Sequence, residues 1–453
     1  MTSAAILTTP ARFPRLLLPA TPPANPLDLE AATAAGAFTA LQNAVDELQA
    51  DGVIKALVES GMRGRGGSGV PIGEKWRACA QAGAGAVADA EAGGRYVVVN
   101  AYQADPAVMT DRVLIETNPY AVIEGAAIAA FAVGASGVVV AIRAEATDAI
   151  RTIEKAIAAA EAAGYIGANV LGTGTEILFS VRPMQGSYML GEETVLLKGL
   201  EGKRGQPEQQ PPYTTTRGLF GKPTLVHGPQ TFAAVPTILS GGIEGFAETG
   251  ARSFAGTVLV QISGAVAQPG VAEVPFGVTI REILDVAGGV PAPHKLKALL
   301  VGGPSGGILP AEGLSVGFDH DSLAKAGAYV GSGSIVVIDQ HSCVVDLAAV
   351  LTRFCADQAC GKTIPCRIGL RRLAEIGARI CEGQPRDDEI TRLTDLSADI
   401  VGSALCDHER RATLALTSVV RYFRDELDAH IVRNTCPAGI CQPKAATRAG
   451  AVS

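Results

Sequence analysis

The segment GMRGRGGSGVPIGEKW, Gly61–Trp76, is the strongest motif in the first half of this 453-residue chain. Four of the six residues in Gly64–Gly69 are glycines, so the backbone amides are bare. Such a loop can wrap a phosphate or lie flat against a planar ring system, and Lys75 adds a point charge that suits a phosphate. The segment matches neither the Walker pattern nor the dinucleotide-binding fingerprint, so its meaning depends on the sequence around it.

Strands and helices alternate around this loop, from Asp46 to about Ser240. Tyr96–Asn100 and Gly137–Ile142 are continuous apolar runs, which is the pattern of strands covered on both faces. Ala144–Gly164 is rich in alanine and glutamate, with its charged residues on one side, and predicts a helix. The alternation predicts an α/β unit built on a βαβ-type sheet.

The second half of the chain contains two regions with different sequence patterns. Thr257–Ser263 and Val271–Val274 flank a turn at Gln268–Gly270 and precede a predicted helix, Thr279–Ala287, so they indicate a small α+β module. Beyond it, four amphipathic segments predict a helical bundle that can hold a cluster at its end. These segments are Ser342–Cys355, Cys366–Glu382, Asp387–Leu405 and His408–Ile431.

Composition excludes several classes of protein. The net charge is −7 with acids and bases mixed, so we expect no nucleic-acid partner. The longest apolar stretch, Ala121–Ile142, carries Glu124 and three glycines and predicts a buried helix and a strand, not a membrane span. The first residues lack the features of a secretory signal, so we expect a cytoplasmic protein whose cysteines hold metal rather than disulfides.

Eight of the nine cysteines fall within Cys343–Cys441. Thiolates are soft ligands that select iron–sulfur clusters and zinc, although buried structural thiols are the alternative, which we prefer for Cys79 and Cys381. Two groups stand out. The first is Cys360, Cys366 and Cys406. The second has the ligand types of a closed Cys3His zinc site and consists of Cys343, His430, Cys436 and Cys441.

Together with the blocks that follow it, the glycine loop resembles the flavin loop of the NADH-oxidising flavoprotein subunit of respiratory complex I. The same family includes the matching subunits of NAD-linked formate dehydrogenases and electron-bifurcating hydrogenases. The resemblance is collinear and covers roughly residues 48–445. Its blocks are Asn100-Ala101, Asp111-Arg112, Asn118-Pro119, Glu124-Gly125, Gly191–Thr194, Glu201–Gly205, Gly221–Thr224, Ser263-Gly264, Pro269-Gly270, Cys360-Gly361, Pro365–Arg367, Gly369 and Cys406.

The resemblance implies three units: an α/β flavin domain, a small β-grasp (ubiquitin-like, SLBB-type) domain and a C-terminal four-helix iron–sulfur bundle. The expected boundaries are an extended N-terminal arm at 1–45, the FMN-binding α/β domain at 46–245, the β-grasp domain at 250–339, the helical iron–sulfur domain at 340–434 and a zinc tail at 435–453.

The resemblance also implies the site residues. Asp105 and Glu193 are the expected catalytic residues. FMN would be held by Gly64, Arg65, Gly66, Lys75, Asn100, Gly191, Glu192, Glu193 and Thr231. A [4Fe–4S] cluster would be held by Cys360, Cys366 and Cys406, but the family's remaining cysteine position is Thr363 here. Such a cluster could use three thiolates and water, recruit Cys355 or His408, take a three-iron form or be absent.

The departures from the family pattern concentrate at the flavin pocket. Tyr102 and His227 replace polar flavin-site residues there. Val70 and Ala78 replace two aromatics, and Glu208 and Gln210 replace two bases, so NAD(H) affinity is expected to be low.

Two functions follow from the resemblance. In the first, the chain is the electron-transfer subunit of a multisubunit NAD(P)H- or ferredoxin-linked oxidoreductase, with a ferredoxin-like or thioredoxin-like [2Fe–2S] subunit among its partners. Hydride would pass to FMN and single electrons to the cluster. In the second, the chain is a degenerate paralogue kept as a structural or docking subunit, with zinc retained. The sequence leaves open whether the chain is itself an enzyme.

Overall fold

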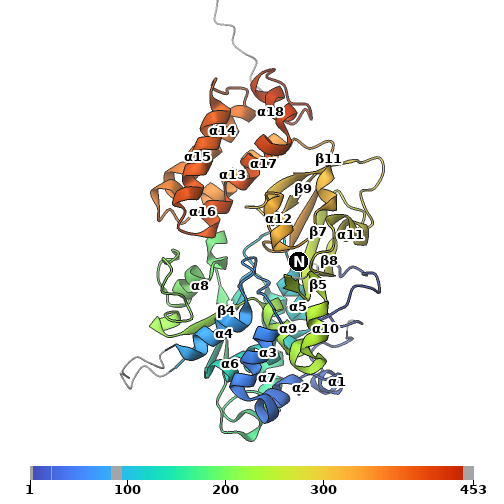
Figure 1. The fold of residues 1–453 in the computed structure, drawn as a ribbon, viewed down its shortest axis with the longest axis vertical. Helices are drawn as coiled ribbons and strands as arrows, with labels where there is room; N and C mark the ends of the chain where they lie inside the picture. The colour runs from blue at the N-terminus through green and yellow to red at the C-terminus, as the bar shows by residue number, and fades with distance from the viewer. Residues whose placement is uncertain (1–3, 22, 83–93, 252, 442–453) are drawn as a thin grey trace, which may run out of the picture.

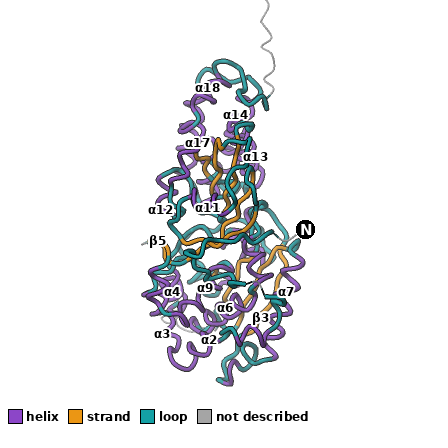
Figure 2. The backbone as a smooth tube through the Cα atoms, turned by 90° about the vertical axis from the view of Figure 1, so that its right-hand side faces the viewer, coloured by secondary structure: helices purple, strands orange, loops and turns teal. Residues whose placement is uncertain are grey.

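The computed structural model describes residues 4–21, 23–82, 94–251 and 253–441. Three units follow one another along the long axis of the molecule (Figures 1 and 2). An α/β unit lies at one end, a smaller sheet lies in the middle and a group of helices forms the other end. The three units predicted from the sequence are confirmed.

The α/β unit contains a parallel four-stranded sheet in the order β3-β2-β1-β4. The strands are β1 (Tyr96–Ala101), β2 (Gly137–Arg143), β3 (Leu178–Met184) and β4 (Thr224–His227). The main helices are α3 (Gln49–Glu59), α4 (Ile72–Gln81), α5 (Thr110–Thr117), α6 (Pro119–Val133), α7 (Thr147–Ala162), α8 (Glu193–Leu200), α9 (Pro229–Gly241) and α10 (Ile243–Glu248). The two apolar runs predicted as strands are β1 and β2.

Helix α6 is buried along almost its whole length and packs against α9. Gly125 permits this contact, because a Cβ atom there would lie 1.9 Å from the Phe232 carbonyl oxygen. Glu124 is also buried, and its Oε1 accepts a hydrogen bond from the Leu41 amide at 3.1 Å. The apolar stretch Ala121–Ile142 is therefore helix and strand, as predicted. No helix in the described part of the chain is both long and apolar enough to span a membrane.

The N-terminal segment lies across the α/β unit and the small sheet. Ile6 forms a parallel bridge with Val271, and the amides of residues 16–18 donate to the buried Glu273 carboxylate. Residues 29–43, which the sequence analysis expects to be extended, form α1 (Leu29–Ala34) and α2 (Thr39–Asn43). The reason is capping: Asp28 accepts from Ala31 at the start of α1, and Glu124 from Leu41 in α2.

The middle unit is a mixed five-stranded sheet in the order β10-β9-β11-β7-β8. Its strands are β7 (Thr257–Gly264), β8 (Gly270–Pro275), β9 (Leu296–Val301), β10 (Gly307–Pro310) and β11 (Ser334–Asp339). Its helices are α11 (Ile280–Val286) and α12 (His320–Lys325), and a small ribbon of β5 (Gly250–Ala251) and β6 (Phe254–Ala255) precedes it. The predicted hairpin and the helix after it are confirmed as β7, β8 and α11.

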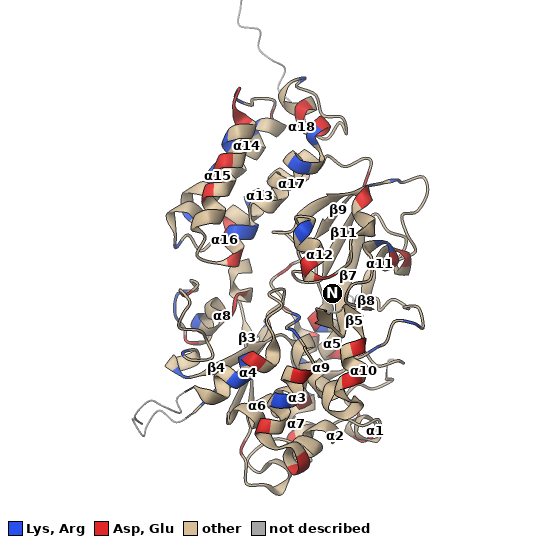
Figure 3. Ribbon diagram, in the orientation of Figure 1, with Lys and Arg blue, Asp and Glu red and all other residues tan. Residues whose placement is uncertain are grey.

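The helices at the C-terminal end pack around one apolar core. They are α13 (Val344–Gln358), α14 (Leu370–Cys381), α15 (Glu389–Ser403), α16 (Asp407–Arg411), α17 (Leu414–Tyr422) and α18 (Arg424–Ile431). The fourth predicted segment is thus three successive helices, and Phe423 leaves the helical conformation between the last two. Residues 442–453 of the predicted zinc tail lie outside the described residues. Basic and acidic side chains are interspersed over all three units (Figure 3).

Candidate functional site

The main cavity has a volume of about 810 Å³ and lies where the three units meet. Its walls come from residues 64–75, 100–111, 188–231, 302–332 and 404–411. The volume falls within the roughly 300–1,000 Å³ that ligand sites usually have. All ten residues predicted to bind flavin or act in catalysis line this cavity: Gly64, Arg65, Gly66, Lys75, Asn100, Asp105, Gly191, Glu192, Glu193 and Thr231.

The cavity opens at the carboxyl ends of the parallel strands, where α/β sheets usually bind ligands. Asn100 ends β1, and its Nδ2 donates to the Gly191 carbonyl oxygen at 2.9 Å, which joins two of the predicted flavin segments. Gly66 has no heavy atom within 4 Å of an added Cβ, so its backbone borders open space. Gly228 and Thr231 place the N-terminal end of the 13-residue helix α9 on the same wall.

Lys75 is fixed in the cavity wall. Its ammonium group lies 2.7 Å from Glu193 Oε2 and 3.0 Å from the Val226 carbonyl oxygen. Both side chains of this ion pair are largely buried. A phosphate at Lys75 would therefore share the ammonium group with Glu193.

Arg65 lines the cavity, and its side chain also contacts the middle unit. Its backbone amide donates to Thr231 Oγ1 at 3.0 Å, and its buried guanidinium donates to the carbonyl oxygens of Ala255 and Thr257 at the edge of the small sheet. Burial lowers the pKa of Arg65 to about 9, while the Glu273 carboxylate opposes that shift. The Arg65 side chain therefore joins two units at the wall of the cavity.

Tyr102 and His227 leave the cavity open. The Tyr102 hydroxyl donates to the Gly186 carbonyl oxygen at 2.6 Å, and its ring belongs to a buried apolar cluster and does not line the cavity. His227 lines the wall, where its Nε2 accepts from Trp76 Nε1 at 3.1 Å. Burial, aided by the charge of Lys75, holds the pKa of His227 well below its usual value, so the ring is neutral.

Buried carboxyl groups line the remaining wall. Asp105 accepts from Ser332 Oγ at 2.6 Å, and burial raises its pKa. Burial also raises the pKa of Asp111 to about 6, although Gln230 donates to this carboxyl group. Such acceptors suit a hydroxyl-rich chain, and the bare amides with Lys75 suit a phosphate. The cavity therefore fits FMN in volume and in donor and acceptor chemistry.

Several wall residues were missed by the sequence analysis. Ser332, Tyr329 and Arg411 come from the middle unit and the helical unit, and they enter the cavity only because the units dock. No local motif marks these three residues, and they lie far from the glycine loop in the sequence, so they could not be predicted as wall residues.

Two cysteines of the predicted cluster group lie against the flavin unit. Cys406 lines the main cavity, and Cys360 packs against the same apolar cluster as Leu190. Burial raises the pKa of Cys366 to about 12 and that of Cys406 to about 11, and the charges of Glu409 and Cys360 add to both shifts.

Thr363, at the position of the missing cysteine, donates from Oγ1 to Glu409 Oε1 at 2.6 Å. The two alternative ligands have other partners. Cys355 Sγ donates to the Pro304 carbonyl oxygen of the middle unit at 3.6 Å, and His408 Nε2 lies 3.0 Å from the Cys355 carbonyl oxygen. The predicted cluster position therefore has three cysteines, and at its fourth place stands a hydroxyl that donates to a carboxylate.

In the second cysteine group the ligand atoms lie close to one another. Its four ligand atoms, from Cys343, His430, Cys436 and Cys441, lie within 4.8 Å of one another. Cys343 Sγ is 3.7 Å from Cys441 Sγ and 3.5 Å from His430 Nε2. With metal–sulfur bonds of about 2.3 Å, a tetrahedral zinc site places its sulfurs about 3.8 Å apart. The four residues therefore fit zinc.

The surroundings of this group agree with metal binding. His430 Nδ1 lies 2.8 Å from the Glu426 carbonyl oxygen, which directs Nε2 toward the sulfurs. Burial opposes ionisation of Cys436, but hydrogen bonds from three backbone amides and His430 lower its pKa to about 6. Cys381, predicted to be structural, lies with Asp346 beside Cys441. The sequence does not predict this contact between Cys381 and Cys441, because it forms only when the C-terminal segment folds back onto the end of α14.

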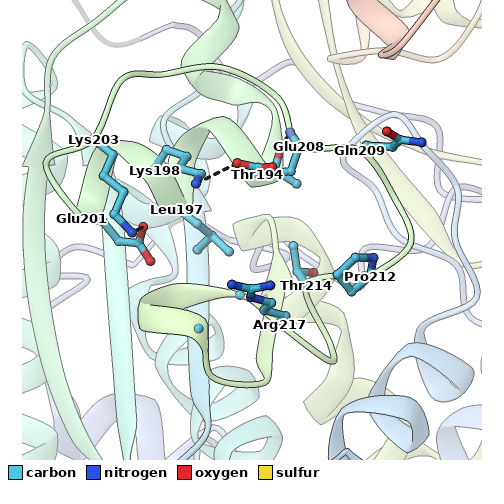
Figure 4. A pocket seen from close by; sticks show the side chains of 12 residues that line it. Thr194, Leu197, Lys198, Glu201, Lys203, Glu208, Gln209, Pro212, Thr214 and Arg217 are labelled. Atoms are coloured by element: carbon cyan, nitrogen blue, oxygen red, sulfur yellow. Dashed lines mark hydrogen bonds and ion pairs between the residues drawn. The ribbon is translucent and has the colours of Figure 1, made fainter.

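A smaller cavity of about 260 Å³ adjoins the main one and shares Glu208 and Gln209 with it (Figure 4). Lys198 Nζ lies 2.7 Å from Glu208 Oε1, and Lys203 pairs with Glu201 at the same distance. The ion pair neutralises the Glu208 carboxylate. Compared with the family pattern, this wall has therefore lost a basic side chain. The Glu208 carboxylate adds little repulsion toward a bound phosphate, because Lys198 pairs with it.

The family comparisons agree with this geometry. Residues 57–237 match the Nuo51 FMN-binding domain, residues 259–309 match the SLBB domain, and residues 346–430 match the NADH-ubiquinone oxidoreductase-F iron-sulfur binding region. The chain is 38% identical over 400 residues to the F subunit of NADH-quinone oxidoreductase from Mycobacterium tuberculosis, covering 88% of this chain and 89% of that protein.

Two further relatives are hydrogenase components. The chain is 38% identical over 390 residues to NADP-reducing hydrogenase subunit HndC of Solidesulfovibrio fructosivorans, covering 86% of this chain and 78% of that protein. A chain of the NAD+-reducing [NiFe]-hydrogenase in the H2-reduced state superposes with a TM-score of 0.79 at 28% identity, over 95% of this chain and 68% of that chain. This chain therefore belongs to the family of the NADH-quinone oxidoreductase F subunits, and its FMN-binding and iron–sulfur regions make it an electron-transfer flavoprotein subunit of an oxidoreductase.

Proposed function

We propose that this chain transfers electrons between a flavin in the main cavity and a cluster at Cys360, Cys366 and Cys406. The observation that carries the proposal is the position of Cys406, which lines the same cavity as the flavin-loop residue Gly66. Bound FMN would exchange a hydride for single electrons, and the cluster would take these one at a time.

The residues of the chain have separate roles in this proposal. The amides of the glycine loop and the N-terminal end of α9 bind the phosphate, and Lys75 shares its charge between Glu193 and the flavin. Asp105, held by Ser332, accepts hydrogen bonds from hydroxyl groups of the ligand. The neutral His227 ring, held by Trp76, forms an uncharged wall.

We propose that NADH binds weakly to this chain, so that NADH is a poor hydride donor to its flavin. Val70, 42% exposed, lines the cavity where the family pattern has an aromatic, and Gln210 Nε2 reaches Glu193 at 3.4 Å. Tyr213, 57% exposed, keeps one aromatic at this wall. Each lost stacking or charge contact weakens binding by about 1 kcal/mol, so several together lower affinity by orders of magnitude.

The test is anaerobic purification of the full chain, followed by flavin, iron and zinc assays and an ultraviolet–visible spectrum. We expect bound flavin and iron, full bleaching by dithionite, and little bleaching or dye reduction with NADH. Micromolar NADH binding with rapid turnover would refute weak binding. Protein with neither flavin nor iron would favour the structural or docking role, which the replacement of a cysteine by Thr363 also favours.

We further propose zinc at Cys343, His430, Cys436 and Cys441, because their spacing suits a closed tetrahedral site. All nine cysteines are free thiols, which agrees with a reducing, cytoplasmic location. The physiological donor or acceptor would then be another subunit of the complex, with a ferredoxin-like or thioredoxin-like [2Fe–2S] protein as the candidate.

A further inference from the structure

We propose that Glu409 is the fourth ligand of the iron–sulfur cluster, so that three thiolates and one carboxylate hold it. This inference rests on the proposed cluster at Cys360, Cys366 and Cys406. It assigns a ligand role to a residue outside the cysteine pattern.

The first observation is position. Thr363 stands where the family pattern has its remaining cysteine, and Glu409 Oε1 lies 2.6 Å from Thr363 Oγ1. Glu409 follows Cys406 by three residues in the sequence, and Thr363 Oγ1 also accepts a hydrogen bond from the Cys366 amide at 3.2 Å. The Glu409 carboxylate thus contacts the residue at the position of the missing cysteine, which in turn contacts the backbone of one of the three cysteines.

The second observation is charge. Glu409 is 1% exposed, and its carboxylate accepts from two neutral donors, the Thr363 hydroxyl and the Leu405 amide at 3.0 Å. In the described part of the chain no basic side chain pairs with it, and both neighbouring arginines, Arg410 and Arg411, bind Asp407 instead. Buried carboxylates are normally paired with a cation or coordinate a metal, and an iron of the cluster supplies that cation.

The alternative role of Glu409 is structural. It is the third residue of α16, and its bond to the Leu405 amide resembles a helix cap. A cap works equally well with a glutamine, whose side-chain oxygen accepts the same hydrogen bond. Iron ligation requires the carboxylate, so Glu409→Gln separates the two roles.

The experiment compares four forms of the full chain after anaerobic reconstitution: wild type, Glu409→Gln, the double variant Thr363→Cys/Glu409→Gln, and the control Glu375→Gln. Glu375 is a half-exposed glutamate on α14 that pairs with Arg372. The measurements are iron and sulfide per chain, Mössbauer spectra of isotopically enriched protein and EPR of the oxidised state.

We expect a four-iron cluster with one oxygen-ligated iron site in the wild type and in Glu375→Gln. Glu409→Gln should lose about one iron per chain and show the EPR signal of a three-iron cluster. The double variant should regain four irons, all bound by thiolate, which also shows that the single variant failed through its ligand and not through its fold.

Three outcomes would overturn the inference. Glu409→Gln could keep four irons and the wild-type spectrum, which would leave Glu409 as a helix cap. The double variant could fail to recover the cluster, or the wild type could already hold three irons. Wild-type protein without any iron would refute the proposed cluster as well, whereas the other outcomes leave that cluster in place.

Discussion

The ammonium group of Lys75 lies between the Glu193 carboxylate and the end of β4 in the flavin cavity. Lys75→Ala removes the cation and leaves Glu193 as an unpaired negative charge beside the ligand. We expect FMN affinity to fall by about 2 kcal/mol, or roughly 30-fold, because one charge-assisted contact is lost. Fluorescence titration of the apoprotein with FMN measures this.

Lys55→Ala is the matched control, since Lys55 is exposed on α3 and pairs only loosely with Glu59 at 3.8 Å. Lys75→Arg should keep most of the affinity because the positive charge remains. FMN binding by Lys75→Ala as tight as by wild type would place the phosphate away from this lysine.

At the scale of elements, one carboxyl group of α6 supports α2. Glu124 accepts a hydrogen bond from the Leu41 amide at 3.1 Å, yet burial raises its pKa from 4.5 to about 7. Because the folded-state pKa is higher, the unfolded chain loses this proton first as pH rises. The group's contribution to stability is therefore full below pH 4.5 and is lost between pH 4.5 and 7, by about 3 kcal/mol.

Glu124→Gln should remove this part of the pH dependence, because the amide keeps an acceptor and cannot ionise. Urea unfolding across the same pH range, compared with the exposed Glu154→Gln of α7, measures the difference. An equal decline in wild type and Glu124→Gln would show that other groups cause it.

The zinc ligands join three separate elements: Cys343 precedes α13, His430 lies in α18, and Cys436 and Cys441 follow it. Cys436→Ala should abolish zinc binding and loosen the C-terminal segment, since a closed zinc site stabilises the segments it joins. Elemental analysis and hydrogen exchange of residues 424–441 test this, with the flavin unit staying protected. Wild-type protein that lacks zinc without ever meeting a chelator would sink the assignment.

At the scale of the whole molecule, Arg65 joins the flavin unit to the middle sheet. Its guanidinium donates to the carbonyl oxygens of Ala255 and Thr257 and stacks near Phe246 and Phe276. Arg65→Met would leave these buried carbonyl groups without donors. We expect the free energy of unfolding to drop by about 3 to 5 kcal/mol.

Thermal and urea unfolding measure this drop, and Arg151→Met on the exposed face of α7 is the control. Limited proteolysis should also reveal faster cleavage between the flavin unit and the middle sheet. If Arg65→Met mainly weakened FMN while stability stayed unchanged, the side chain would act at the flavin and not between the units.

Residue type and spacing were enough to predict most of the helices and strands and the candidate ligand residues. The apolar runs of β1 and β2, the helix–strand division of Ala121–Ile142 and the hairpin of β7 and β8 follow from periodicity and turn residues, which act over a few positions. The cysteine groups and the glycine loop were likewise visible, because residue type and spacing mark them.

The directions and the partners of individual side chains, in contrast, could not be predicted from residue type and spacing. Arg65 turns toward the middle sheet, Cys381 meets Cys441, and Glu409 reaches Thr363. These partners are distant in sequence, and their contacts arise when separately folded units or helices dock. Local periodicity fixes the face of an element, whereas packing between elements fixes the partner of each side chain.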